Sequence, residues 1–168
     1  MMLKHKHNNG LGLVEIVVGT AIISLSLVGL VTAFNVFIRT GLSNTNKIQA
    51  TYIMEEGLEA IRYLRDSGYS SNISTLTSGT PYYLLFDGSD WSATTTATLI
   101  DSRFDRTITI ADVYRHDSDD DIIASTSPDS KTLDSNTIQA TVTVSWDSSG
   151  SVSEEISAVE YLTDFYDN

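Results

Sequence analysis

The hydrophobic and polar positions divide the chain into three stretches with different patterns. Residues 11–38 are overwhelmingly apolar, and Glu15 is the one charged residue among them. A run of this length can cross the hydrocarbon core of a bilayer as a helix, which takes about 20 apolar residues. Two basic residues, Lys4 and Lys6, precede the run. They predict a single span with its N-terminus in the cytoplasm and the rest of the chain outside.

The next stretch, residues 42–66, has the period of an amphipathic helix. Its apolar residues recur at three- and four-residue spacing and form one stripe: Ile53, Met54, Gly57, Leu58, Ile61 and Leu64. Charged residues lie off the stripe, with Glu59 three positions before Arg62. No proline interrupts the pattern, and Ser67-Gly68 predicts its end. We therefore expect one helix over residues 11–66, with its N-terminal half transmembrane.

After residue 67, β-prone stretches alternate with runs of Ser, Thr, Asn and Gly. The pattern predicts strands at 82–86, 94–100, 106–114, 137–146 and 156–162. Residues 137–146 alternate most cleanly and place Trp146 on the inward face, whereas Trp91 is expected on a loop. Asp87-Gly88 and residues 147–150 predict tight connections. The expected fold class is α+β, a long N-terminal α-helix packed on a C-terminal, mostly antiparallel β-sheet.

The charge is as unevenly distributed as the hydrophobicity. The chain has a formal net charge of −12 at pH 7, and residues 66–168 hold 18 acidic against four basic residues. Because such a surface repels a phosphate backbone, we expect no nucleic-acid partner. The absence of cysteine excludes disulfides, zinc–thiolate sites, iron–sulfur clusters and thiol nucleophiles.

The residue types that enzymes use are scarce. His5 and His7 precede the apolar run, which leaves His116 as the one histidine after it. One histidine without cysteine builds neither a His/Cys metal cluster nor a Cys–His pair. The sequence also has no Gly-x-Ser-x-Gly motif and no Gly-rich phosphate loop. We therefore expect a protein that is not an enzyme and uses no cofactor.

One acidic segment has a partial metal-binding pattern. Asp117, Asp119 and Asp121 are spaced like the first ligands of a calcium loop. Ile122 stands where that motif needs glycine, and Pro128 where it needs a bidentate glutamate. Calcium binding and a solvated acidic turn between strands both remain open.

The start of the apolar run resembles the leader junction of a known family. GLGLVE, residues 10–15, follows a short basic segment. It is similar to the class III leader of type IV prepilins, in which a membrane peptidase cuts after glycine and the new N-terminus is methylated. The resemblance implies cleavage between Gly10 and Leu11, methylation at Leu11, and an assembly role for Glu15 at the fifth mature position. The family usually has phenylalanine where Leu11 stands and threonine where Gly12 stands.

Electrostatics gives Glu15 a role that agrees with this resemblance. After cleavage Leu11 would carry a positive amine, and a carboxylate in a low-dielectric bundle attracts such an amine far more strongly than in water. The amine of a neighbouring subunit could therefore neutralise Glu15 and set the axial register. In the alternative interpretation, Glu15 merely reaches the membrane interface.

The resemblance continues along the chain and implies an organisation and a function. MEEGLEAIRYLRDSGY and the strand pattern of the last 65 residues or so are similar to prepilin-like minor pilins and pilus modification proteins. The implied parts are a basic leader (1–10), a long helix (11–66) and an acidic, β-rich head (67–168). The implied function is a structural subunit, more specifically a minor pilin, in the inner membrane and then in a pilus at the cell surface. Its partners would be a prepilin peptidase and methylase, other pilin subunits, an inner-membrane assembly platform and membrane lipid.

Other interpretations of the N-terminal run fit less of the sequence. A secretory signal peptide has an apolar region of about 7–15 residues before a small-residue cleavage site. This run is longer and ends at residues 35–39 without such a site. A plain transmembrane anchor leaves Glu15 unexplained. Two alternatives to a pilus subunit stay open: a membrane-anchored extracytoplasmic binding module that does not polymerise, and a pseudopilin of type II secretion.

Overall fold

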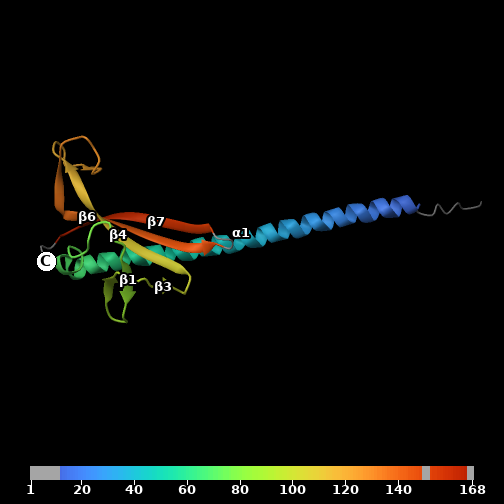
Figure 1. The fold of residues 1–168 in the computed structure, drawn as a ribbon, viewed down its shortest axis with the longest axis horizontal. Coiled ribbons are helices and arrows are strands. Elements are labelled where there is room, and N and C mark those ends of the chain that lie inside the picture. The colour runs from blue at the N-terminus through green and yellow to red at the C-terminus, as the bar shows by residue number, and fades with distance from the viewer. Residues whose placement is uncertain (1–11, 149–151, 166–168) are drawn as a thin grey trace, which may run out of the picture. The chain divides into compact units, whose positions relative to one another are not determined.

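A computed structural model describes residues 12–148 and 152–165. Its helices are α1 (Leu13–Ser67) and α2 (Tyr69–Asn72). Its strands are β1 (Tyr83–Phe86), β2 (Trp91–Thr94), β3 (Leu99–Ile100), β4 (Phe104–His116), β5 (Ile122–Ile123), β6 (Lys131–Ser148) and β7 (Val152–Thr163), shown in Figure 1. The chain forms two compact units, Met1–Thr45 and Asn46–Asn168, and α1 contributes to both. The predicted α+β class is confirmed.

Helix α1 begins and ends close to the predicted residues. It is helical from Leu13 to Ser67 without a break at its glycines. It ends where Gly68 adopts a φ of 152°, a conformation that glycine tolerates better than other residues. The Gly68 N–H donates to the Arg65 carbonyl at 3.2 Å and so closes the last turn. The predicted stop at Ser67-Gly68 is confirmed.

The strands form one five-stranded sheet and one hairpin. The sheet has the order β3-β4-β6-β7, with the short β5 also paired to β4, and every pairing is antiparallel. The hairpin of β1 and β2 is linked to β4 by a bridge between Tyr82 and Ile108. Its turn is held by Asp87, whose Oδ1 accepts hydrogen bonds from the N–H groups of Ser89 (2.9 Å) and Asp90 (3.0 Å). The predicted turn at Asp87-Gly88 is confirmed, whereas the turn predicted at 147–150 lies partly outside the described residues.

One predicted strand is wrong. Residues 94–100 do not form a single strand, because β2 ends at Thr94 and β3 begins only at Leu99. The Thr94 hydroxyl accepts a hydrogen bond from the Thr96 N–H at 3.2 Å. Threonine side chains that bond nearby backbone in this way compete with strand pairing. The run of threonines therefore bends here, although threonine favours strands in general.

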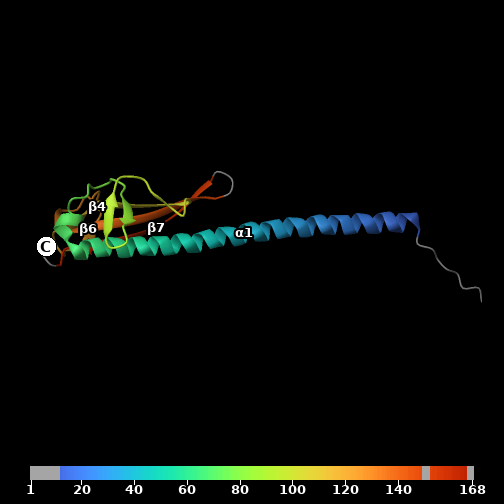
Figure 2. The same cartoon turned by 90° about the horizontal axis from the view of Figure 1, so that it is seen from below.

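The core lies between the C-terminal part of α1 and one face of the sheet, as Figure 2 shows for the second unit. The predicted apolar stripe is confirmed, since Gly57, Ile61 and Leu64 are buried against the inward side chains of β4, β6 and β7. Those inward residues are Ile108, Ala140, Val142 and Leu162. A second cluster joins Ala50 to Phe104, Val144 and Trp146. The predicted inward position of Trp146 is therefore also confirmed.

Ion pairs flank this packed face. Arg62 Nε lies 2.7 Å from Glu160 Oε1 on β7, and Lys47 Nζ lies 3.5 Å from Glu154 Oε2 on the same strand. The predicted pair within the helix, Glu59 with Arg62, is present at 3.9 Å. Exposed pairs of this kind contribute little each, so the apolar core supplies most of the stability.

A buried arginine is the feature of this core that the sequence analysis missed. The Arg106 side chain is 4% exposed and lies on the inward face of β4. Its Nη1 donates to the Ile53 carbonyl (3.1 Å) and to Glu56 Oε2 (2.8 Å), both on α1. Its guanidinium also lies 5.5 Å from the centre of the Trp91 ring, a cation–π distance. The signal was present in the sequence, because Arg106 has the same strand parity as Phe104 and Ile108.

Gly57 allows α1 to approach this arginine closely. A Cβ atom added to Gly57 would lie 2.8 Å from Val142 Cγ1 and 3.0 Å from Arg106 Cδ. Both distances are shorter than ordinary carbon contacts. The helix and the sheet can therefore pack at this separation only because position 57 has no side chain.

We predict that Gly57→Ala destabilises the second unit by about 1–3 kcal/mol through overpacking. Chemical denaturation followed by tryptophan fluorescence measures this, because Trp146 is in the core. Gly41→Ala is the matched control, since a Cβ there meets nothing within 4 Å. If Gly57→Ala matches the wild type in stability, the close contact does not constrain the fold.

Candidate functional site

The N-terminal part of α1 exposes a continuous apolar surface in the first unit. Leu13 is 78% exposed and Phe37 is 76% exposed. Among the described residues, α1 is the one helix that is long and apolar enough to cross a membrane, with a mean hydropathy of 2.3 over its most apolar window. The helix is therefore compatible with a single-pass membrane anchor.

The hydroxyl groups of this segment are satisfied inside the helix. Residues 13–38 contain four of them, on Thr20, Ser24, Ser26 and Thr32. Each donates to a main-chain carbonyl three or four residues earlier, at 2.8–3.0 Å. A hydroxyl that is bonded within its own helix needs no water, which lowers the cost of placing it in lipid. Glu15 and Asn35 are the remaining polar side chains of the segment.

Glu15 lies in the first turn of α1. Its Oε2 accepts a hydrogen bond from the Gly12 N–H at 3.2 Å, which satisfies one of the free N–H groups at the start of the helix. The side chain is exposed within this chain, so it is accessible to a group from elsewhere. The predicted cleavage residues, Gly10 and Leu11, lie outside the described residues.

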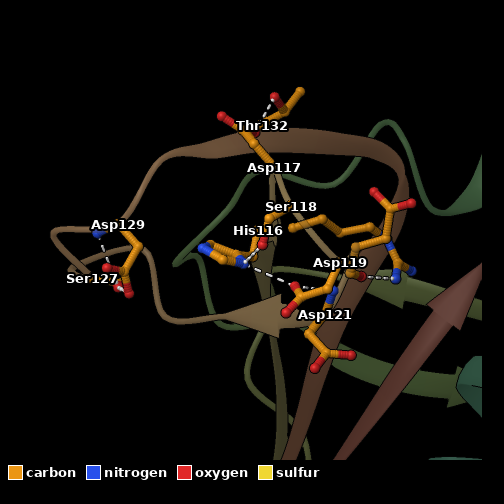
Figure 3. A network of polar contacts seen from close by, with 10 residues as sticks. His116, Asp117, Ser118, Asp119, Asp121, Ser127, Asp129 and Thr132 are labelled. Carbon is orange, nitrogen blue, oxygen red and sulfur yellow. Dashed lines mark hydrogen bonds and ion pairs between the residues drawn. The ribbon is translucent and has the colours of Figure 1, made fainter.

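The acidic segment after β4 forms a hydrogen-bonded turn, drawn in Figure 3. The N–H of Asp120, which has a φ of +58°, donates to the His116 carbonyl at 3.0 Å. The N–H of His116 in turn donates to the Asp121 carbonyl at 2.9 Å. The turn thus connects β4 to β5 with its own backbone hydrogen bonds.

The three carboxylates proposed as calcium ligands do not converge. Asp117 Oδ1 accepts from the Thr132 hydroxyl at 2.9 Å, whereas Asp119 Oδ1 contacts His116 Nδ1 at 2.8 Å. Figure 3 shows the carboxylates of Asp117 and Asp121 pointing apart. Within residues 12–148 and 152–165, no group of three or more His, Cys, Asp or Glu side chains is placed to hold a metal ion. The geometry gives the calcium hypothesis no support and agrees with a solvated turn.

His116 and Asp119 form an ion pair in this turn, with 2.8 Å between Nδ1 and Oδ1. The hydrogen bond with Asp119 raises the pKa of His116 above its usual value, and the negative charges of Asp119, Asp129 and Asp117 act in the same direction. The same hydrogen bond lowers the pKa of Asp119. The charged pair is therefore favoured at mildly acidic pH.

Trp91 is half-buried and Trp146 is buried. Trp91 was expected on a loop, but it begins strand β2 and packs against the main core, where Arg106 lies over its ring. That expectation was wrong, because the Phe86–Trp91 contact across the hairpin, with ring centres 5.2 Å apart, brings Trp91 into the strand pair.

Comparison of the chain with protein-family models, with curated proteins and with solved structures finds no match.

We predict that His116 titrates above its ordinary pKa of about 6.5 and that Asp119→Asn returns it toward that value. Because the pKa of His116 is raised, the stabilisation that the pair gives the folded state through His116 is complete at low pH and is lost as the pH rises through the folded-state pKa of His116. Because the pKa of Asp119 is lowered, the stabilisation through Asp119 is lost as the pH falls through the folded-state pKa of Asp119. NMR titration of the His116 ring measures the shift. Asp121→Asn is the control, because that carboxylate belongs to the same turn without contacting the ring, and an equal shift in both variants would contradict the pairing.

Proposed function

We propose that this chain is a structural subunit of a type IV pilus or a related filament, as a minor pilin, which is cleaved after Gly10 and docks through Glu15. The observation that carries the proposal is α1. One unbroken helix combines an exposed apolar segment, whose hydroxyls are internally bonded, with an amphipathic segment that packs on a sheet. Such a helix needs an apolar environment for its first part and a folded domain for its second.

A filament supplies that environment after the membrane does. Before assembly, lipid covers the apolar side chains, with the N-terminus in the cytoplasm and the head outside the inner membrane. In a filament, the same side chains pack against those of neighbouring helices. When α1 moves from the membrane into the filament, its apolar side chains are not exposed to water. The segment that anchors the chain in the membrane then forms the core of the filament.

Glu15 has the properties that a docking residue needs in this proposal. Its Oε2 accepts a hydrogen bond from the Gly12 N–H, which orients the side chain. Glu15 follows Leu11 by four residues, which is about one helical turn from the methylated amine expected at Leu11. In a bundle of such helices, the amine of one subunit and the carboxylate of another attract each other in a low dielectric. The pair fixes the register because both charges are costly in lipid when they are alone.

We predict that Glu15→Gln lowers incorporation into filaments at least about tenfold, since an uncharged amide loses a buried ion pair. Cleavage after Gly10 continues, because the peptidase acts before docking. Immunoblots of sheared filaments and of membranes, made in cells that express the variant, separate the two effects. Ser24→Ala is the matched control within the same apolar segment, because its hydroxyl bonds only within the helix. Normal incorporation of Glu15→Gln would contradict the docking mechanism.

We predict that a bulky residue in place of Gly10 blocks processing. Gly10→Leu keeps the apolar run intact, so the chain still inserts in the membrane and accumulates there at its unprocessed mass. Mass spectrometry of the membrane fraction shows this directly. If Gly10→Leu is cleaved as efficiently as the wild type, the proposed peptidase site is not at this junction.

A further inference from the structure

A pocket lies on the face of the sheet opposite to the one that packs on α1. Its volume is about 360 Å³, within the range of pockets that hold small ligands. Its floor is one cross-strand row, formed by Ala111 on β4, Gln139 on β6 and Tyr161 on β7. Residues 122–125 form a wall, since β5 and the chain after it lie beside β4.

A carboxylate lines this pocket next to an irregularity in the pairing of β4 and β6. Strand alternation after the buried Ile110 would turn Asp112 inward, but the register between β4 and β6 shifts between Asp112 and Val113. Next to this shift, Val113 is buried and Asp112 is exposed among the residues that line the pocket. Bulges commonly re-aim a side chain next to a functional site. Within the described part of the chain, the Asp112 carboxylate has no hydrogen-bond or ion-pair partner of its own.

Tyr161 and Gln139 hold each other in place on the floor. Gln139 Nε2 donates to Tyr161 Oη at 3.2 Å, and the tyrosine side of the pair is open, with Tyr161 45% exposed. The phenol keeps its own proton to donate, and the amide keeps its oxygen to accept. The pocket therefore offers a flat aromatic ring bordered by donors and acceptors of hydrogen bonds.

The neighbouring rows of the sheet extend this polar surface. The next row is Thr109, Thr141 and Val159, and the row after it is Thr107, Thr143 and Ser157. Successive rows on one face lie about 7 Å apart along the strands. Most side chains in these rows carry hydroxyls, so the surface beyond the pocket can hydrogen-bond a ligand longer than the pocket itself.

We propose that this pocket binds an uncharged sugar residue of a polysaccharide. A sugar has an apolar face that stacks on an aromatic ring and hydroxyls that pair with a carboxylate and an amide, which is what Tyr161, Asp112 and Gln139 provide. No lysine or arginine lines the pocket, and residues 66–168 carry 18 acidic against four basic residues, so acidic sugars are repelled. A cationic peptide could use the carboxylate and the face of the ring, but the rows of hydroxyls beyond the pocket suit a ligand that itself carries many hydroxyls. The proposal goes beyond the filament role and does not rest on polymerisation.

The test uses the purified full chain in a zwitterionic detergent, because detergents with sugar headgroups would compete for the site. Saturation-transfer NMR and calorimetry are run with neutral trisaccharides of glucose, mannose and N-acetylglucosamine, with trigalacturonate, and with trilysine. We expect saturable binding of at least one neutral trisaccharide and no binding of trigalacturonate. Tyr161→Ala and Asp112→Asn each weaken that binding about tenfold or more, as expected when one good contact is lost. Tyr52→Ala is the matched control, because Tyr52 is an exposed tyrosine on α1 away from the pocket.

Three results would overturn the proposal. The first is that no neutral trisaccharide binds at about 10 mM, a concentration that would largely saturate a site with a Kd of about 1 mM. The second is binding that Tyr161→Ala and Asp112→Asn leave unchanged. The third is binding of trilysine alone with loss in Asp112→Asn, which would assign the pocket to a cationic peptide. Gln139→Ala provides a second floor variant if Tyr161→Ala fails to fold. Because these measurements use purified protein, their failure is distinct from a failure of filament incorporation in cells.

Discussion

The apolar surface of α1 is the constraint on which the rest of the account depends. Between Leu13 and Ile38 the helix exposes large aliphatic and aromatic side chains that nothing else in the described chain covers. Exposing such a surface to water costs much free energy, and lipid or other apolar helices around this segment would remove that cost. The internal hydrogen bonds of the four hydroxyls fit both environments. In the proposed filament, an ion pair with a neighbouring chain would give the Glu15 carboxylate a partner of opposite charge.

The second unit folds without disulfides, because the chain has no cysteine. It is stabilised by a long antiparallel sheet that packs on the amphipathic part of α1. Because Gly57 has no side chain, α1 lies close enough for Arg106 to donate hydrogen bonds to two acceptors on the helix. The burial of the Arg106 charge therefore depends on glycine at position 57. Because the arginine also lies against Trp91, the β1–β2 hairpin is joined to the same point. The opposite face of the sheet does not pack on α1, and the pocket beside Tyr161 lies on that face.

Much of the fold could be predicted because its signals are local. The long helix, its stop at Gly68 and the inward face of β6 follow from periodicity and from the conformational freedom of glycine. The features that the sequence did not predict depend on side-chain hydrogen bonds or on contacts between distant residues. The break between β2 and β3 depends on a hydrogen bond of the Thr94 hydroxyl, and the position of Trp91 depends on its contact with Phe86. The irregularity next to Asp112 depends on the register between β4 and β6. For this reason the sequence predicts a candidate metal site at the acidic turn, where the aspartates are adjacent, and gives no signal for the pocket, whose residues come from separate strands.

The most direct test of the central claim is the intact mass of the protein isolated from filaments and membranes of its native cells. The account predicts a chain that begins at Leu11 and carries one methyl group on its N-terminal amine. A chain that begins at Met1 or Met2 in both fractions would contradict it, because an unprocessed leader leaves no free amine beside Glu15 and no route into a filament.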